Sequence, residues 1–135
     1  MRITQLPTPV LAGVINQKSK DGAISDIKNC TFAGADIIDL HLETLEERNE
    51  EVLKEIIKSS KLPVLALNYV KTTSEEDTEA FEMMRIESFL TALEAGAAGI
   101  DMQGYTFDIA SKTSPDFKLY MFLEVKVAIR VRFPS

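Results

Sequence analysis

The chain has one cysteine, a deficit of positive charge and no long apolar run, and each shortage excludes a class of protein. Cys30 is the only cysteine among 135 residues, so an internal disulfide is excluded and we expect a small buried hydrophobe within a helix. The formal net charge of −6 and the pI near 4.8 argue against a surface for nucleic acid or an anionic membrane. No apolar run approaches the roughly 20 residues that span a bilayer, and the N-terminus lacks a signal-peptide pattern. We therefore expect a cytoplasmic enzyme or binding domain.

The sequence also lacks the motifs of common cofactor sites. No expected strand is followed by a Gly-x-Gly-x-x-Gly loop or by a Gly-x-x-x-x-Gly-Lys-Ser/Thr loop, which weakens the case for a nucleotide-binding sheet. His41 is the only histidine, and no lysine falls at the inward end of an expected strand. We therefore expect no cofactor and no resident metal.

The clearest pattern is a motif that occurs twice. In each copy a Gly-Ala pair is followed by an apolar run with a polar residue at every second position. The copies are residues 34–42 and 96–103. Successive side chains of a strand point to opposite faces, so the polar residues of each copy share one face. A strand with one apolar face and polar groups near one end of the other face suggests a binding cavity. The polar residues are Asp39 and His41 in the first copy, and Asp101 and Gln103 in the second.

Expected strands and helices alternate along the chain. Thr44 and Glu47 have the spacing of a capping box, so the second helix is expected to begin there. Gly34 is placed to end the first helix in a left-handed conformation. The rhythm indicates right-handed βαβ crossovers and a parallel sheet. Four strands are expected at 9–15, 34–42, 63–69 and 98–103, with helices at 23–33, 45–60 and 81–96.

Two architectures fit this rhythm, an open doubly wound sheet and a piece of a (β/α)8 barrel. The polar residues cluster at the carboxyl ends of the second, third and fourth expected strands, where barrel enzymes build their sites. We therefore favour an α/β fold that is a partial (β/α)8 TIM barrel, with about four βα units in residues 1–104.

Residues 105–135 differ in character from the rest. The part up to Asp116 is expected to be a loop, whereas residues 125–133 alternate between apolar and mostly basic side chains. Four Lys and Arg residues against one Glu give residues 117–135 a net charge of +3. One interpretation is an amphipathic strand that covers an open sheet edge. The other is that the tail belongs to no native fold, through truncation or a change of reading frame.

Three stretches resemble the type I 3-dehydroquinate dehydratase family. Residues 33–43 (Ala-Gly-Ala-Asp-Ile-Ile-Asp-Leu-His-Leu-Glu) are similar to its second strand, Ala-Gly-Ala-Asp-x-x-Glu-x-Arg-x-Asp. Residues 62–69 look like its third strand, Pro-x-x-x-Thr-x-Arg, and residues 95–103 like its fourth, Gly-x-x-x-Ile-Asp-x-Glu. The resemblance covers about residues 9–104. It implies a TIM-barrel lyase that converts 3-dehydroquinate to 3-dehydroshikimate, in the shikimate pathway of aromatic amino acid biosynthesis.

The resemblance assigns substrate-holding positions to this chain, with changes at most of them. A family Glu falls on Asp39, a family Arg on His41 and a family Asp on Glu43. Another family Arg, which holds the substrate carboxylate, falls on Tyr69, and Gln103 replaces a Glu. Asp101 matches the family. The candidate substrate-binding residues are Asp39, His41, Glu43, Tyr69, Asp101 and Gln103.

No catalytic residue is identified by the resemblance. The family's Schiff-base lysine and its acid/base histidine belong to later strands, and neither Lys71 nor any other residue here corresponds to them. His41 is either a structural residue or an acid/base group. Asp39 and Asp101 could form a carboxylate pair for a metal or for acid/base work, or each could cap a terminus above the sheet.

Two hypotheses follow for the function. In the first, the chain is the truncated and catalytically impaired half of a dehydratase-like lyase, whose substrate is a carboxylated cyclic polyol. In the second, it is a non-catalytic half-barrel module for binding or scaffolding, which self-associates to complete the barrel. A free-standing hydrolase has no nucleophile and base pair to support it.

Overall fold

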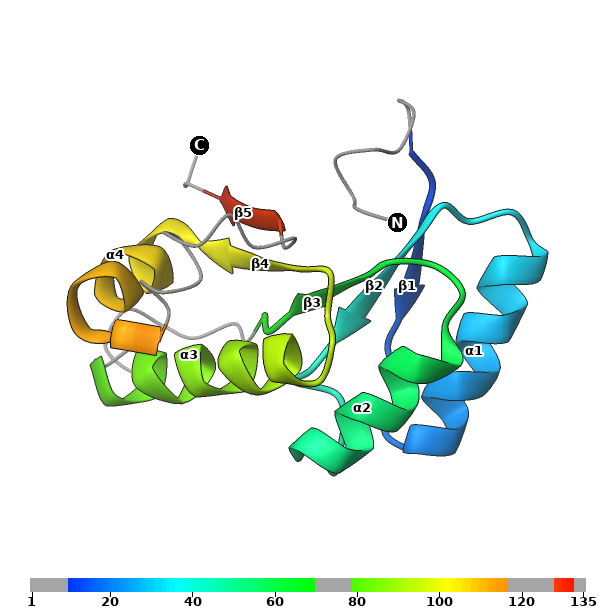
Figure 1. Cartoon of the computed structure of the whole chain (residues 1–135), viewed down its shortest axis with the longest axis horizontal. Coiled ribbons are helices and arrows are strands. Elements are labelled where there is room, and N and C mark those ends of the chain that lie inside the picture. The colour runs from blue at the N-terminus through cyan, green and yellow to red at the C-terminus, as the bar shows by residue number, and fades with distance from the viewer. Residues whose placement is uncertain (1–9, 70–78, 117–127, 133–135) are drawn as a thin grey trace.

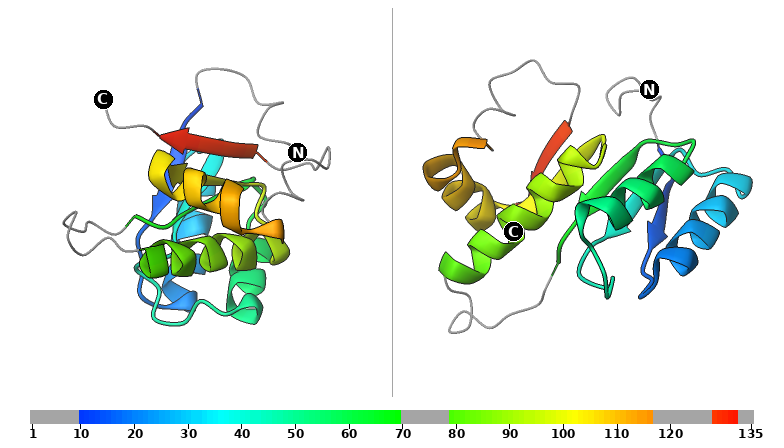
Figure 2. Two further views of the ribbon diagram at one scale, coloured as in Figure 1. Left: turned by 90° about the vertical axis from the view of Figure 1, so that its left-hand side faces the viewer. Right: turned by 60° about the horizontal axis from the view of Figure 1, so that its bottom comes forward.

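The fold is a parallel sheet with helices wrapped around one side. The computed structural model describes residues 10–69, 79–116 and 128–132. Helices α1 to α4 follow one another around the same side of the curved sheet (Figures 1 and 2). The strands are β1 (Ala12–Ile15), β2 (Ile37–His41), β3 (Val64–Leu67), β4 (Gly99–Gln103) and β5 (Ala128–Arg132). The helices are α1 (Lys20–Phe32), α2 (Glu50–Ser59), α3 (Glu79–Glu94) and α4 (Gly104–Thr113).

The strand order decides between the two expected architectures. All neighbouring strands pair in parallel, and the sheet has the order β1-β2-β3-β4-β5. A doubly wound sheet reverses its strand order and places helices on both faces. Here the order never reverses and the helices stay on one side, as in a TIM barrel. The expected partial barrel is confirmed.

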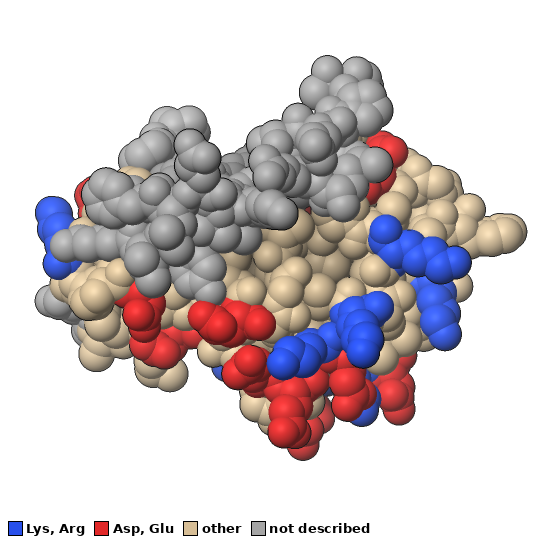
Figure 3. All heavy atoms as spheres, in the orientation of Figure 1, with Lys and Arg blue, Asp and Glu red and all other residues tan. Residues whose placement is uncertain are grey.

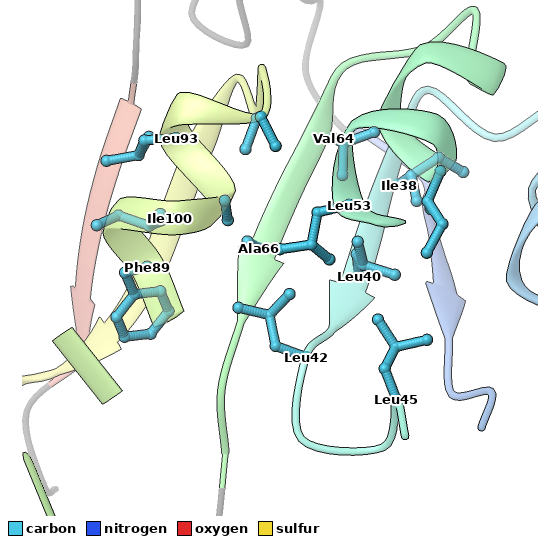
Figure 4. Close-up of a cluster of buried hydrophobic side chains, with 14 of the residues drawn as sticks. Ile38, Leu40, Leu42, Leu45, Leu53, Val64, Ala66, Phe89, Leu93 and Ile100 are labelled. Atoms are coloured by element: carbon cyan, nitrogen blue, oxygen red, sulfur yellow. The ribbon is translucent and has the colours of Figure 1, made fainter. Parts of the chain in front are cut away.

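The hydrophobic core lies between the sheet and the helices. Ile38, Leu40 and Leu42 on β2 and the residues after it are completely buried on this side (Figure 4). They pack in one cluster with Leu53 of α2 and Phe89 of α3. The alternation expected for residues 34–42 therefore places the apolar residues toward the helices, and it leaves Asp39 and His41 on the opposite face.

Helix α1 has the boundaries that local capping gives it. The Ser19 hydroxyl accepts a hydrogen bond from the Gly22 backbone N–H at 3.0 Å and begins the helix at Lys20. Gly34 follows the end of the helix with φ of +99°, so the left-handed conformation expected there is confirmed. Cys30, expected to be fully buried, is half-buried and packs against the edge of the core.

The expected start of α2 is wrong. Helix α2 begins at Glu50, and the side chain of Asn49 accepts from the Val52 backbone N–H at 2.9 Å. The Thr44 hydroxyl instead donates to the backbone oxygens of Gln17 and His41, both at 3.1 Å. Thr44 therefore connects the loop after β2 with the loop after β1. Because its hydroxyl is used there, it does not cap α2, and the helix begins later in the chain.

The loop expected between residues 104 and 116 is also wrong, because α4 occupies most of it. Ala110 of this helix is completely buried, and α4 packs on α3. Helix α4 was not predicted from the sequence, because its burial depends on packing against α3. Of the two interpretations of the tail, the structure agrees with the amphipathic strand over 128–132, where β5 pairs with β4 and covers its edge. Residues 117–127 and 133–135 lie outside the described residues.

The surface of the helical side carries charges of both signs. Lys and Arg side chains lie among Asp and Glu side chains around α2 (Figure 3). Lys20 of α1 and Glu55 of α2 form an ion pair at 2.8 Å, and this hydrogen bond with Glu55 raises the pKa of Lys20 above its usual value. None of the helices in the described ranges is long and apolar enough to cross a membrane.

Candidate functional site

The candidate residues gather at the carboxyl ends of β2 and β4, on the face that the helices do not cover. The register places His41 of β2 beside Leu67 of β3, and Leu67 beside Asp101 of β4. Parallel strands end at a common edge, so these positions form one row across the sheet. Leu67 is a buried apolar residue between two polar positions. The row is therefore a mixed surface, of the kind that lines small-molecule sites.

His41 and Glu43 are in direct contact. The Nδ1 atom of His41 lies 2.6 Å from Oε1 of Glu43, with the side chains 20% and 15% exposed. Leu42, between them, is completely buried, and its backbone N–H donates to the Leu67 oxygen at 2.7 Å. Because neighbouring residues of a strand point to opposite faces, the side chains of His41 and Glu43 lie together on the face opposite to Leu42. This pair was not predicted, because the sequence analysis treated the two residues as separate substrate contacts.

Glu43 has a further unusual feature. Its second carboxylate oxygen, Oε2, is buried and has no hydrogen-bond partner among the residues that the structure describes. A buried carboxylate oxygen ordinarily accepts hydrogen bonds, and an exception marks a place where another group can bind. Glu43 therefore has one oxygen for His41 and one oxygen that is available.

Asp39 and Asp101 are not brought together. Asp39 lies beside Leu65 in the register and Asp101 beside Leu67, so strand β3 lies between them and they are offset by two residues along the sheet. Their backbones are about 12 Å apart, from two strand spacings of about 4.8 Å and a rise of about 3.3 Å per residue. Asp101 is only 5% exposed, whereas Asp39 is half-buried. No group of three or more His, Cys, Asp and Glu side chains in the described ranges is placed to hold a metal ion.

Tyr69 and Gln103 lie at the outer limit of the site. Tyr69 comes two residues after the end of β3 and is 55% exposed. Gln103 is the last residue of β4, and the register places its backbone beside Arg132 of β5, as it places Asp101 beside Arg130. The structure therefore adds two arginine positions to the carboxyl edge, which the resemblance could not indicate.

A second polar group was missed by the sequence analysis. Glu82 of α3 is completely buried and contacts Arg85 at 3.0 Å, and Arg85 is only 3% exposed. The Thr106 hydroxyl of α4 donates to the other oxygen of Glu82, and the guanidinium of Arg85 lies 4.8 Å from the ring centre of Phe81. An acid and a base three residues apart on a helix usually face solvent. The sequence therefore offered no sign of burial here.

Asn68 connects this group with the end of β3. Its side-chain amide donates to the Ser88 hydroxyl at 2.8 Å, and that hydroxyl donates to the Arg85 backbone oxygen at 2.6 Å. The Asn68 Oδ1 atom is buried without a hydrogen-bond partner within the described part of the chain. Asn68 follows directly after Leu67, and its contact with Ser88 of α3 places its side chain on the helix-covered face, opposite to the candidate site.

The described residues contain no strand lysine. Every lysine in the described ranges lies in a helix or in a loop between elements. A Schiff-base lysine needs a desolvated position beside a proton-transfer group, which a barrel supplies from its strands. Lys71 lies outside the described residues.

Comparisons with known proteins establish the fold. No protein-family model matches the chain, and no curated protein does. A type I 3-dehydroquinate dehydratase from Clostridium difficile, solved with covalently modified comenic acid, superposes with a TM-score of 0.68 at 17% identity, covering 94% of this chain and 51% of that one. A proposed phosphonomutase from Burkholderia cenocepacia superposes with a TM-score of 0.53 at 19% identity, covering 92% and 54%. The chain has the fold of part of a TIM barrel and spans about half the length of each of these structures.

Proposed function

We propose that the carboxyl edge of this sheet binds a small molecule and belongs to a lyase of the dehydratase type, distantly related to type I 3-dehydroquinate dehydratase. The observation that carries this proposal is the row of polar residues on the face that the helices leave free, with His41 and Asp101 in one register. TIM-barrel enzymes build their sites at this edge. From the resemblance in sequence, we propose a carboxylated cyclic polyol as the ligand class.

The residues divide into groups with different capacities for such a ligand. Asp101, Glu43 and Asp39 can accept hydrogen bonds from hydroxyl groups. Tyr69 replaces a permanently charged arginine by a neutral hydroxyl, which weakens the hold on a carboxylate.

Catalysis by a Schiff base is not part of the proposal for this chain. Because the lysines of the described residues lie outside the strands, we expect binding without formation of a covalent adduct. The protein would then bind the ligand, and a Schiff base would require a lysine other than those in the described residues.

The test combines binding with chemical trapping. Titration of ¹⁵N-labelled protein with 3-dehydroquinate should shift the backbone resonances of His41 and Asp101. Reduction of the mixture with borohydride should leave the protein mass unchanged. Asp101→Asn should weaken binding about tenfold, as the loss of one charged hydrogen bond predicts, while the exposed control Asp108→Asn should not. The absence of any shift in the wild type would remove the proposed function, and a trapped adduct would show that Lys71 or another lysine is catalytic.

A second candidate function is a half-barrel module that pairs with another copy. It is favoured by exposed apolar residues at the outer strand β1, where Val14 is 53% exposed, and by Val10 and Leu11 just before the strand, which are also exposed. An outer strand with exposed apolar side chains is a template for pairing with another chain. Analytical ultracentrifugation should then find a dimer that Val14→Lys converts to a monomer. A wild-type monomer at all concentrations would exclude this candidate.

A further inference from the structure

The contact between His41 and Glu43 has a geometry that also suits proton transfer. A carboxylate 2.6 Å from one imidazole nitrogen determines which nitrogen carries the hydrogen when the ring is neutral. With a carboxylate at Nδ1, the hydrogen resides on Nδ1 and is donated to Glu43. The other nitrogen, Nε2, is then left with a free lone pair and can accept a proton.

The backbone around this pair is held firmly. Leu42 is completely buried and bonded to β3, and the Arg48 guanidinium donates to the Leu42 backbone oxygen at 3.1 Å. The Thr44 hydroxyl donates to the His41 backbone oxygen at 3.1 Å. These hydrogen bonds fix the backbone at the end of β2, from which the side chains of His41 and Glu43 extend. Proton-transfer groups in enzymes are held by such supporting contacts.

We propose that His41 is a proton acceptor for a hydroxyl group of the bound ligand, and that Glu43 is the positioning residue that holds its ring. This inference rests on the proposed function for the ligand, but the role of Glu43 can be tested without one. In the transfer, the ligand O–H proton moves to Nε2 and its electron pair stays on the ligand oxygen. The imidazolium that forms is stabilised by the carboxylate beside Nδ1.

The second oxygen of Glu43 supports this assignment independently. Oε2 is buried and has no hydrogen-bond partner among the described residues, although such an oxygen normally has one. It lies on the carboxylate that contacts His41, so the group that positions the ring has hydrogen-bonding capacity left over.

The first experiment is a tautomer measurement by long-range ¹H–¹⁵N NMR on the full chain, made at a pH at which the ring nitrogen shifts identify the neutral form. His41 is the only histidine, so its ring signals need no assignment. The wild type should show the Nδ1–H tautomer. Glu43→Ala should shift the ring toward Nε2–H, and the control Glu46→Ala, with an exposed carboxylate in the same loop, should not. An Nε2–H ring in the wild type would overturn the proposal, whether or not the variant folds.

The second experiment adds 3-dehydroquinate as a polyhydroxylated probe. The Nε2 signal of wild-type His41 should move on binding, and His41→Phe should weaken binding about tenfold, the factor that one hydrogen bond of about 1.4 kcal/mol represents. If the backbone of Asp101 responds while the His41 ring does not, this inference is wrong and the proposed function stands. If nothing responds, the proposed function fails, and the proton-acceptor role fails with it.

Discussion

Glycine is required at position 13 because β1 and α1 approach each other closely there. A Cβ atom built on Gly13 would lie 2.7 Å from Cys30 Cβ and 2.8 Å from its Sγ. Carbon atoms in contact ordinarily lie 3.5 to 4.0 Å apart. The sulfur could turn away, but Cβ is fixed by the helix backbone. The strand and the helix can therefore keep their spacing only while residue 13 has no side chain.

Gly13→Ala should destabilise the protein by about 1–3 kcal/mol, the usual cost of overpacking. Urea unfolding of this variant and of Gly34→Ala separates two causes. Nothing lies within 4 Å of a Cβ at Gly34, where φ is +99°, so that change should cost about 1–2 kcal/mol through backbone strain alone. In a Cys30→Gly background the penalty at Gly13 should shrink, and the penalty at Gly34 should not. An unchanged penalty at Gly13 would contradict the steric explanation.

Glu82 and Arg85 form a buried ion pair whose partners depend on each other. Removal of one charge deprives the other of its ion-pair partner in the interior. We expect Arg85→Met to destabilise the protein by about 3–5 kcal/mol, and the double change with Glu82→Leu to cost less than the single change. The exposed pair of Glu50 and Lys54, at 3.8 Å, is the matched control, and Lys54→Met should change stability by less than about 0.5 kcal/mol.

Thermal unfolding followed by circular dichroism checks these values. A double variant less stable than Arg85→Met would show that Glu82 is stabilised mainly by other groups, such as the Thr106 hydroxyl.

At the scale of elements, the start of α2 shows how a loop competes with a helix. The segment from Thr44 to Asn49 could begin a helix, but Thr44 and Arg48 both use their side chains to bond the backbone around β2. These bonds keep His41, Leu42 and Glu43 in place at the candidate site. The loop is therefore part of the site's support, and Asn49 takes over the role of cap.

Asn49→Ala should destabilise the protein by about 1 kcal/mol, because the Val52 N–H loses its acceptor, while Asn49→Asp should not. Thr44→Ala should leave α2 intact and should instead increase amide exchange in residues 41–46. Hydrogen exchange followed by NMR distinguishes the two effects. If Thr44→Ala instead speeds amide exchange at the start of α2, then Thr44 caps this helix in solution, as the sequence predicted.

At the scale of the whole molecule, β5 determines which edges of the sheet are open. It pairs with β4 over residues 99–103, so β1 and β5 are the outer strands of the described sheet. A parallel barrel has no outer strands when it is closed. The exposed apolar residues of β1 are what such an open half would leave uncovered. β1 is therefore the edge of the described sheet at which another chain or segment could pair.

Proline in β5 tests its part in the sheet. Successive backbone N–H groups of a strand point to opposite sides, so either Ile129→Pro or Arg130→Pro removes a hydrogen bond to β4. We expect faster amide exchange in β4 for one of the two variants, together with increased aggregation through the freed edge. Ile129→Val is the control and should exchange like the wild type. Equal protection of β4 in all variants would show that β5 does not pair with β4 in solution.

Much of the fold follows from local patterns in the sequence. The alternation around Asp39 and His41, the end of α1 at Gly34 and the rhythm of strands and helices depend on residues that are close together in the chain. Periodicity and glycine conformation act over a few residues, so they can be recognised without a structure. The partial barrel and the polar face of β2 were predictable for this reason.

Other features were decided only by tertiary structure. The burial of Glu82 and Arg85, the existence of α4 and the pairing of β5 with β4 each depend on elements that meet across the chain. The contact of His41 with Glu43 depends on side-chain conformation as well as alternation. The sequence by itself determined which residues reach the carboxyl edge. Packing between distant elements decided which of them touch there, because contact distances of a few ångströms are set by the whole assembly of helices and strands.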